Sequence, residues 1–447
     1  MKYLFFCFAI AIALTSCSDN DDFVPEEEGP FDRTVLVYMS GENNLSRYIK
    51  EELEELKEGS KNIGQNALVV YVDEASSQNN PYILRIANGV VKDSIPMTDE
   101  ALSSDPSVFA KVLSYTSTNY PASEYGLVLW GHASGWLFED SVEVSGSRRL
   151  VSGPIKAFGA DTGNNRASLA NLTWMNIPTM AQVLSKWGQH LKFIMADCCQ
   201  FQCIEAAYEL RNCAEYIIAS PAEIPGKGAP YVTVTKHFFS KNTDFYKDIV
   251  DSYFAQVIKV NYVKDWSFDI SYNARTPLSV IKTSELPSLA TATSNALKSI
   301  EVMSFDKLPK LHSEKLIYYY GNVDKVVENC MYDMNDIFLH YADSSIYSSW
   351  KKAFDQAVVY KVNARDGWMT DKQILPYVFG KTADDVPSTQ VLTDERYGGV
   401  SMFVPQKTTG TWYFPYKNRN GHDANGYNAD IKKTAWYHAA KLSELGW

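Results

Sequence analysis

Five short apolar segments, separated by helical stretches, constrain the fold of this chain more than any other feature. The segments cover residues 34–39, 67–72, 126–130, 193–196 and 216–219. The first is continuous and β-branched, as expected of a strand that is buried on both faces. The helical stretches cover residues 45–57, 108–115, 180–187 and 204–211. Strands joined by helical crossovers predict an α/β fold with a mostly parallel central sheet and helices on both faces.

The chain of 447 residues is long enough for more than one domain. Beyond about residue 240 the pattern changes to longer helical stretches, at 284–302 and 349–359, and ends with an apolar strand at 399–405. We therefore expect a signal peptide at 1–16, an acidic tether at 17–31, an α/β domain at 32–240, and a mainly helical C-terminal domain with a small sheet at 241–447.

The first residues are typical of a sorting signal. Lys2 precedes an apolar run at 3–14 that is too short to span a bilayer. The run ends in Leu-Thr-Ser-Cys, which resembles the lipobox of bacterial lipoproteins, so Cys17 is the expected lipid attachment site. An acidic stretch follows and resembles a surface-export signal. We expect an outer membrane lipoprotein, facing the cell surface or the periplasm, with the membrane as partner through the lipid on Cys17.

Composition excludes some functions and singles out the cysteines. A net charge of -11 without a basic stripe argues against a nucleic-acid partner. Five of the seven cysteines lie in the mature body, and four of them, Cys198, Cys199, Cys203 and Cys213, occur in one short stretch. An odd number with this clustering is unlike a disulfide framework, and indicates that at least one thiol is free.

Two predicted strands are followed at once by residues that can perform chemistry. His132 comes directly after Trp130-Gly131, and Cys199 follows Asp197-Cys198. The carboxyl ends of parallel strands meet at one edge of a sheet, so these side chains are expected on the same edge. A thiolate attacks carbonyl carbons, and histidine exchanges protons near neutral pH, which together favour acyl transfer.

The same residues allow other interpretations. The cysteines could be small core residues, and the histidine could be structural. The serine-hydrolase motif Gly-x-Ser-x-Gly fails, because Ser134 has His132 where glycine is needed. The four clustered cysteines lack the paired spacing of a zinc site, and no Asp-rich loop resembles a strong calcium site. We therefore expect no cofactor and no required metal.

Several motifs, in order, resemble the clostripain family of cysteine peptidases. They are residues 34–45, 129–132, 197–199, 205–210 and 399–405. The resemblance implies a caspase-like α/β sandwich and a catalytic dyad of His132 and Cys199. It also implies that the backbone N–H groups of Ala133 and Cys199 form the oxyanion hole. Cys198 and Ala133 depart from the small residue and the glycine that are usual at these positions in the family.

The resemblance also implies cleavage of peptide or protein substrates after Arg or Lys, with Asp197 in the P1 pocket and Glu223 as a second carboxylate. Lys227 lies where acidic residues are common in the family, and its charge would oppose a cationic P1 side chain. Self-cleavage after Arg148 or Arg149, between the two dyad residues, is expected to activate the enzyme. The alternative is a non-catalytic surface protein that binds partners through its many Trp and Tyr residues.

Overall fold

The structure is a computed structural model of the whole chain. It describes residues 30–76, 80–97, 101–138, 143–144, 147–148, 157–163, 172–264, 268–309, 311, 316–319, 331–364, 393–405 and 429–447. The predicted signal peptide, the lipidation site at Cys17 and residues 17–29 of the predicted tether lie outside the described residues, whereas Phe31, placed at the end of the tether, already begins the first strand.

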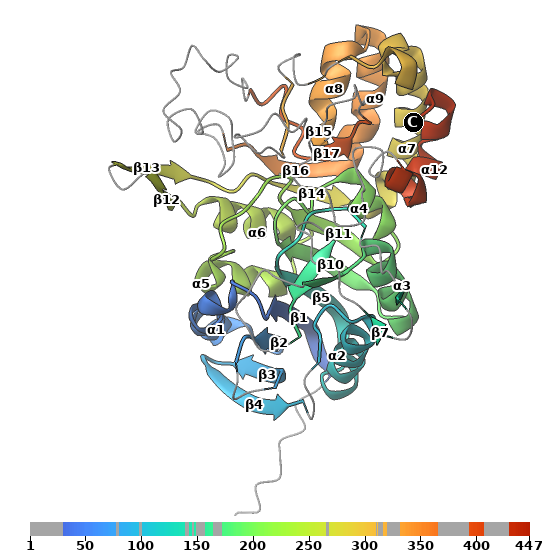
Figure 1. The fold of residues 1–447 in the computed structure, drawn as a ribbon. Helices are drawn as coiled ribbons and strands as arrows, with labels where there is room; N and C mark the ends of the chain where they lie inside the picture. The colour runs from blue at the N-terminus through green and yellow to red at the C-terminus, as the bar shows by residue number, and fades with distance from the viewer. Residues whose placement is uncertain are drawn as a thin grey trace, which may run out of the picture.

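A nine-stranded mixed sheet forms the centre of the molecule, with the strand order β16-β14-β11-β10-β5-β1-β2-β3-β4 (Figure 1). The strands are β1 (Phe31–Gly41), β2 (Ala67–Glu74), β3 (Tyr82–Ala87), β4 (Val90–Pro96), β5 (Ala122–Gly131), β10 (Leu191–Asp197), β11 (Ala214–Ala219), β14 (Leu278–Lys282) and β16 (Val358–Val362). The five central strands, from β11 to β2, are parallel, and the outer strands are antiparallel. The five predicted strands are thus the parallel centre, and an antiparallel hairpin of β3 and β4 extends the sheet beyond β2.

Helices cover both faces of the sheet, as the alternation of strands and helices predicts. One face packs against α1 (Ser46–Gly59), α5 (Tyr231–Val234) and α6 (Phe245–Phe254). The other packs against α2 (Pro106–Asn119), α3 (Ile177–Trp187), α4 (Ile204–Glu209), α7 (Leu286–Ser299), α8 (Met334–Tyr341), α9 (Ser344–Ala357) and α12 (Ala435–Ala439). The two groups lie on opposite sides of the strands in Figure 1.

The side chains of each central strand alternate between these two cores. In β10, Phe193 and Met195 point to the core under α1, α5 and α6, whereas Ile194 and Ala196 point to the other core. This period of two explains why the strand segments are apolar throughout. It also sends Asp197, the last residue of β10, toward the face that α1, α5 and α6 cover.

The part of the chain after residue 240 is continuous with the sheet, because β14 and β16 extend it beyond β11. Apart from these two strands and small hairpins it is mainly helical. The late apolar segment forms β17 (Ser401–Phe403), which pairs with β15 (Met331–Asp333). Further short pairs are β6 (Glu143–Val144) with β7 (Ser147–Arg148), β8 (Phe158–Asp161) with β9 (Thr173–Met175), and β12 (Ile258–Lys264) with β13 (Phe268–Ala274). Within the described ranges, no helix combines the length and the apolar character that a membrane crossing needs.

Candidate active site

The two residues predicted to form the dyad emerge at the same edge of the sheet. Strands β5 and β10 are parallel neighbours, and Asp197 lies opposite Trp130 in their register. His132 and Cys199 each follow two residues beyond this pair. Since neighbouring strands lie about 4.8 Å apart, the loops that carry the imidazole and the thiol begin side by side.

The imidazole of His132 is held by a residue that sequence reasoning did not single out. Its Nε2 atom lies 2.6 Å from Oδ1 of Asn44, in the turn between β1 and α1. An amide oxygen only accepts, so Nε2 carries the proton and Nδ1 is left as the acceptor. Burial lowers the pKa of His132 to about 4, so the ring is neutral at pH 7. Asn44 lies within the family-like segment 34–45, but its spacing from His132 gave no sign of contact.

The thiol of Cys199 faces the loop that follows β11. Its Sγ atom accepts a hydrogen bond from the backbone N–H of Ile224 at 3.4 Å, and donates weakly to the carbonyl of the same residue at 3.7 Å. Burial and the negative charge of Glu223 raise the pKa of Cys199 to about 12. The next residue, Gln200, has a φ of 57°, a left-handed conformation that residues other than glycine rarely adopt. Cys199 therefore lies on a sharp, strained turn and carries a neutral thiol in this state.

The other cysteines have different surroundings. All four described cysteines, Cys198, Cys199, Cys203 and Cys213, are free, whereas the sequence predicted at least one free thiol. Cys198 is fully buried and its Sγ donates to the carbonyl of Leu129 at 3.1 Å, so it points into the core. In the part of the chain that the structure describes, the cysteine sulfurs form no group that could hold a metal ion.

Asp197 is buried beneath the site and accepts three hydrogen bonds. Its Oδ2 accepts from the backbone N–H of Ala229 at 2.9 Å and from the hydroxyl of Tyr231 at 2.8 Å. Its Oδ1 accepts from the hydroxyl of Tyr253 at 2.7 Å. Burial raises the pKa of Asp197, and these three donors lower it. A Cβ atom at Gly228 would overlap this carboxylate, so the loop after β11 closes tightly over it.

Glu223 and Lys227 both lie in that same loop, between β11 and α5. Glu223 is partly buried near Cys199, and burial raises the pKa of its carboxyl group. The ammonium of Lys227 instead pairs with Glu51 at 2.6 Å and Glu55 at 3.1 Å, both on α1. Its positive charge is therefore engaged by the helix, which reduces the repulsion expected between Lys227 and a basic P1 side chain.

The remaining predicted site residues are placed as follows. Ala133 forms an isolated bridge with Phe158, directly after His132. Arg148 is the last residue of β7, and nothing is described of its side chain. Arg149 lies outside the described residues.

A group of three buried carboxylates lies at the same edge of the sheet. Glu42, Asp73 and Asp161 bring one oxygen each within 4.8 Å of one another, so the group could hold a metal ion. Burial and the neighbouring carboxylate of Asp161 raise the pKa of Asp73. Asp161 accepts hydrogen bonds from Ser103 and from the backbone of Gly163. The three acids are far apart in the sequence, and no motif marks them.

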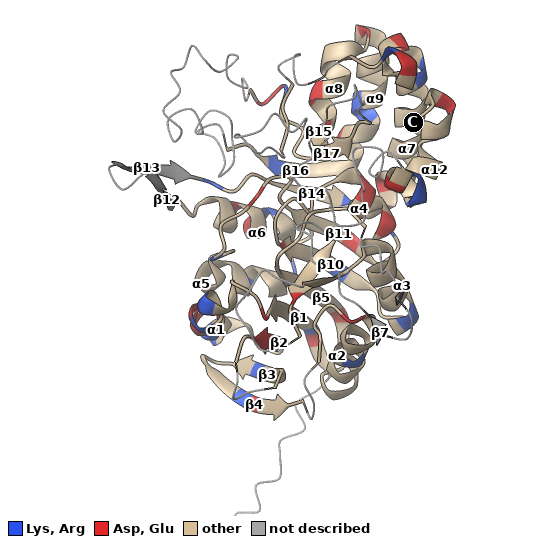
Figure 2. Ribbon diagram, viewed as in Figure 1, with Lys and Arg blue, Asp and Glu red and all other residues tan. Residues whose placement is uncertain are grey.

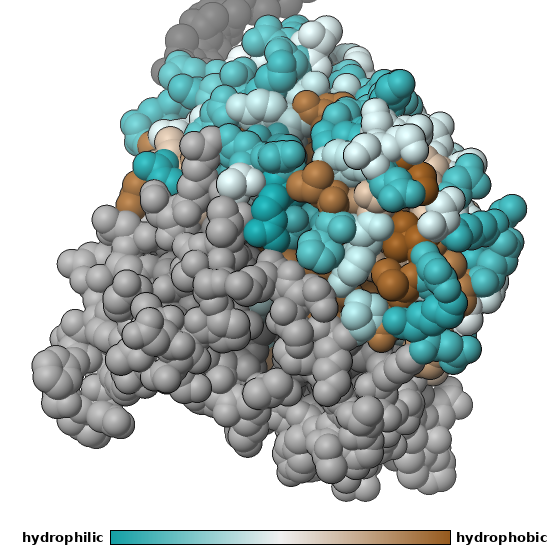
Figure 3. Space-filling view, turned by 90° about the horizontal axis from the view of Figure 1, so that it is seen from above, coloured by the Kyte–Doolittle hydropathy of each residue, from teal (hydrophilic) through white to brown (hydrophobic). Residues whose placement is uncertain are grey.

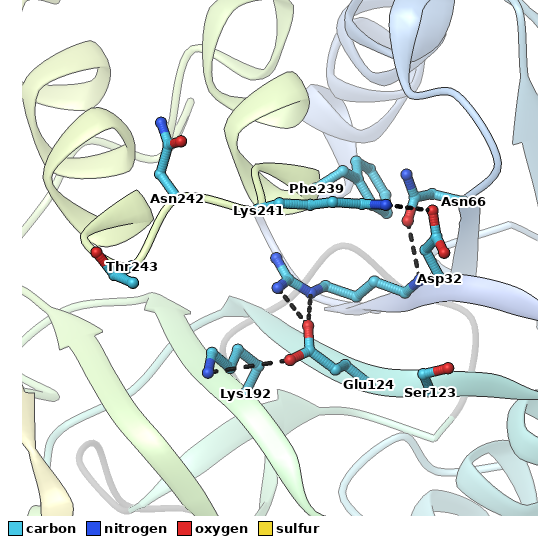
Figure 4. A pocket seen from close by; sticks show the side chains of 10 residues that line it. Asp32, Asn66, Ser123, Glu124, Lys192, Phe239, Lys241, Asn242 and Thr243 are labelled. Carbon is cyan, nitrogen blue, oxygen red and sulfur yellow. Dashed lines mark hydrogen bonds and ion pairs between the residues drawn. The ribbon is translucent and has the colours of Figure 1, made fainter.

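A pocket of about 360 Å³ lies at the opposite edge of the sheet, where β1, β5 and β10 begin (Figure 4). Its charged side chains pair with one another: Arg33 with Glu124 at 2.5 Å, Lys241 with Asp32 at 2.8 Å, and Lys192 with Glu124 at 3.9 Å. It contains no cysteine or histidine. The groups suited to acyl transfer are thus at the carboxyl edge.

The sequence model of the clostripain family matches residues 37–442, which is most of the chain. The chain belongs to the clostripain family. It is thus a cysteine peptidase, and its substrates are peptides or proteins. Among curated proteins, none matches it.

Solved structures of other clostripain-family enzymes resemble the chain along nearly its whole length. A secreted C11 cysteine protease from Bacteroides thetaiotaomicron, in complex with an irreversible peptide inhibitor, is 27% identical with a TM-score of 0.65. An inactive zymogen C11 protease from Parabacteroides distasonis is 24% identical with a TM-score of 0.61. Each alignment covers 92% of this chain and 99% of the other. They confirm the caspase-like α/β sandwich.

Proposed function

We propose that this clostripain-family peptidase is an endopeptidase that cleaves after Arg or Lys through a dyad of Cys199 and His132. The observation that carries the proposal is the matched placement of the two residues, each two positions beyond the Trp130–Asp197 pair of adjacent parallel strands. The free thiol and the neutral imidazole supply a nucleophile and a proton acceptor.

The reaction proceeds in two steps. Nδ1 of His132 takes the thiol proton, and the Cys199 sulfur attacks the carbonyl carbon of the scissile bond. The N–H groups of Ala133 and Cys199 stabilise the oxyanion. The tetrahedral intermediate collapses as the imidazolium gives its proton to the leaving amine, which leaves a thioester on Cys199. Water, giving its proton to the imidazole, then attacks this thioester. The carboxylic acid is released and the Cys199 thiol takes the proton back.

The electrostatics of the uncut chain support a latent state. With a thiol pKa near 12 and an imidazole pKa near 4, the reactive thiolate–imidazolium pair is not populated at pH 7. Self-cleavage after Arg148 or Arg149, in the interval between the dyad residues, is the proposed activation step. The solved inactive zymogen of a related C11 protease supports the proposed latency.

The basic P1 preference rests on the carboxylates near Cys199. Asp197 lies two residues before the nucleophile, and Glu223 is close enough to raise the thiol pKa. Pairing of Lys227 with α1 supports the same preference, because its charge is already neutralised. We further propose that a lipid on Cys17 anchors the enzyme to the outer membrane.

Covalent labelling tests the proposal. The mature protein is incubated with a peptidyl acyloxymethyl ketone carrying Arg or Lys at P1, before and after nicking with trypsin, and the adduct is located by mass spectrometry. We expect labelling at Cys199 that is lost in His132→Ala and retained in Cys198→Ala, the matched variant of the neighbouring thiol. Absence of any adduct in both the intact and the nicked protein would contradict the peptidase mechanism.

The binding-protein alternative is less well supported. Trp130, Trp350 and Trp436 are fully buried, and the exposed large hydrophobic residues in the described part of the chain are all Val or Ile. On the face shown in Figure 3, hydrophobic residues form small groups among polar ones. Among the described residues, the large aromatic side chains that such a protein would use are mostly in the core.

A further inference from the structure

Glu52 is a buried acid that the proposed chemistry does not use. It lies on the inner side of α1, between the turns that carry Ile49 and Leu56, and is 0% exposed. Neither carboxyl oxygen has a hydrogen-bond partner among the described residues. Leaving a buried polar group unpaired lowers stability, so a buried carboxyl group without a partner calls for an explanation.

The position of Glu52 links it to Asp197. Helix α1 packs on α5, whose Tyr231 donates to the Asp197 carboxylate at 2.8 Å. Among the charged groups near Glu52, Asp197 raises its pKa most. The charges of both acids raise the pKa of Tyr231. Burial and the negative charges of Asp197 and Glu55 raise the pKa of Glu52 to about 10. Glu52 is therefore protonated at pH 7. Its neighbour Asp197 is the acid that the proposed function assigns to the P1 pocket.

The loop after β11 leads from the nucleophile to this pair of acids. Ile224 contacts the sulfur of Cys199, Lys227 pairs with Glu51 and Glu55 of α1, and Ala229 donates to Asp197. In Figure 2 the ribbon at α1 carries both acidic and basic residues. Lys227 thus neutralises Glu51 and Glu55 of α1, whereas Glu52 on the same helix has no partner among the described residues.

We propose that Glu52 is a specificity-determining residue, which pairs with the cationic end of a P1 Arg or Lys side chain alongside Asp197. This inference rests on the proposed peptidase function. A guanidinium or ammonium group would supply the donors that Glu52 lacks. Glu52 loses its proton to solvent as the cation binds, so basic P1 binding releases a proton. The other titratable groups that interact with Glu52 are Asp197, Glu51, Glu55, Lys227 and Tyr231.

The variant Glu52→Gln tests this directly, because an amide is close in shape and charge to the protonated acid and keeps the unliganded fold. The activated enzyme is assayed with fluorogenic peptides carrying Arg or Lys at P1. We expect kcat/KM to fall by about tenfold or more, mainly through KM, because a charge-assisted contact is lost. Alkylation of Cys199 by iodoacetamide should be unchanged. The matched control is Glu54→Gln, on the exposed face of α1, where Glu54 pairs with Lys57.

A second measurement is independent of turnover. Calorimetric titration with benzamidine, a soluble mimic of the P1 guanidinium, in buffers of different ionisation heat should show release of up to about one proton by the wild type at pH 7. The same titration should show none for Glu52→Gln. Equal kinetics for the two Gln variants, or benzamidine binding without proton release by the wild type, would overturn the inference but leave the peptidase intact. A wild type that neither cleaves nor labels would instead remove the proposed function.

Discussion

Asn44 Oδ1 lies 2.6 Å from His132 Nε2, and so joins the β1–α1 turn to the loop after β5. The contact fixes the tautomer with Nδ1 free to take the thiol proton. Asn44→Ala should lower kcat by about tenfold or more with little change in KM, because one orienting hydrogen bond is lost. Steady-state kinetics check this, with Asn119→Ala, an exposed asparagine at the end of α2, as control. A fall confined to KM would argue against a positioning role.

In the uncut chain, the rate of alkylation at Cys199 should depend on pH as expected for a thiol that is neutral at pH 7. Burial and Glu223 raise the pKa of Cys199 to about 12, so the thiolate is scarce at pH 7 and increases about tenfold per pH unit. The rate of iodoacetamide alkylation at Cys199 should therefore rise through pH 7–9 without a plateau. A plateau below pH 8 in the uncut chain would mean that the thiolate–imidazolium pair already exists.

Gly228→Ala should destabilise the protein more than Gly188→Ala. Both glycines have a left-handed backbone, with φ of 73° and 74°. Alanine costs about 1–2 kcal/mol there. At Gly188 the added methyl group lies 4.0 Å from the carbonyl oxygen of Lys186, whereas at Gly228 it overlaps the Asp197 carboxylate. Urea unfolding should show an additional loss of about 1–3 kcal/mol for Gly228→Ala. Equal losses would mean that the loop does not press on Asp197.

Glu52→Gln should become more stable than the wild type as pH rises. The pKa of Glu52 is about 10 in the folded protein and near 4.5 when unfolded. The folded state therefore holds the proton more tightly, and its stability falls between pH 4.5 and pH 10, by at most about 1.4 kcal/mol per unit. Urea midpoints at pH 5, 7 and 9 should diverge from those of Glu54→Gln. Parallel curves would show that Glu52 is ionised in the folded protein.

Replacing Arg148 and Arg149 together with alanine should keep the chain uncut and nearly inactive on basic peptides. Cys199→Ala should also stay intact, because self-cleavage needs the nucleophile. Gel electrophoresis follows the cut, and adding trypsin to Cys199→Ala shows whether the segment is accessible. Full activity of an uncut Arg148→Ala/Arg149→Ala chain would remove this activation step.

The sequence predicted the parallel centre of the sheet because β1, β2, β5, β10 and β11 are buried on both faces and so are apolar throughout. The same pattern placed His132 and Cys199 at one edge. It could not reveal the contact of Asn44 with His132 or the burial of Glu52, because both depend on how distant segments pack together. Nor could it show that Lys227 pairs with α1, since the charge of a residue does not identify its partner. Nor did it predict the antiparallel strands β14 and β16, because they lie in a region where the helical pattern predominates.

The direct pairing of β5 with β10 also determines what a break in the intervening chain would do. One fragment would keep β1 to β5 and the imidazole, the other β10 onward and the sulfur, and the backbone ladder between those strands would still join them. Such a nicked protein would migrate as a single species on a sizing column and separate only under denaturing conditions. Each half would be inert alone.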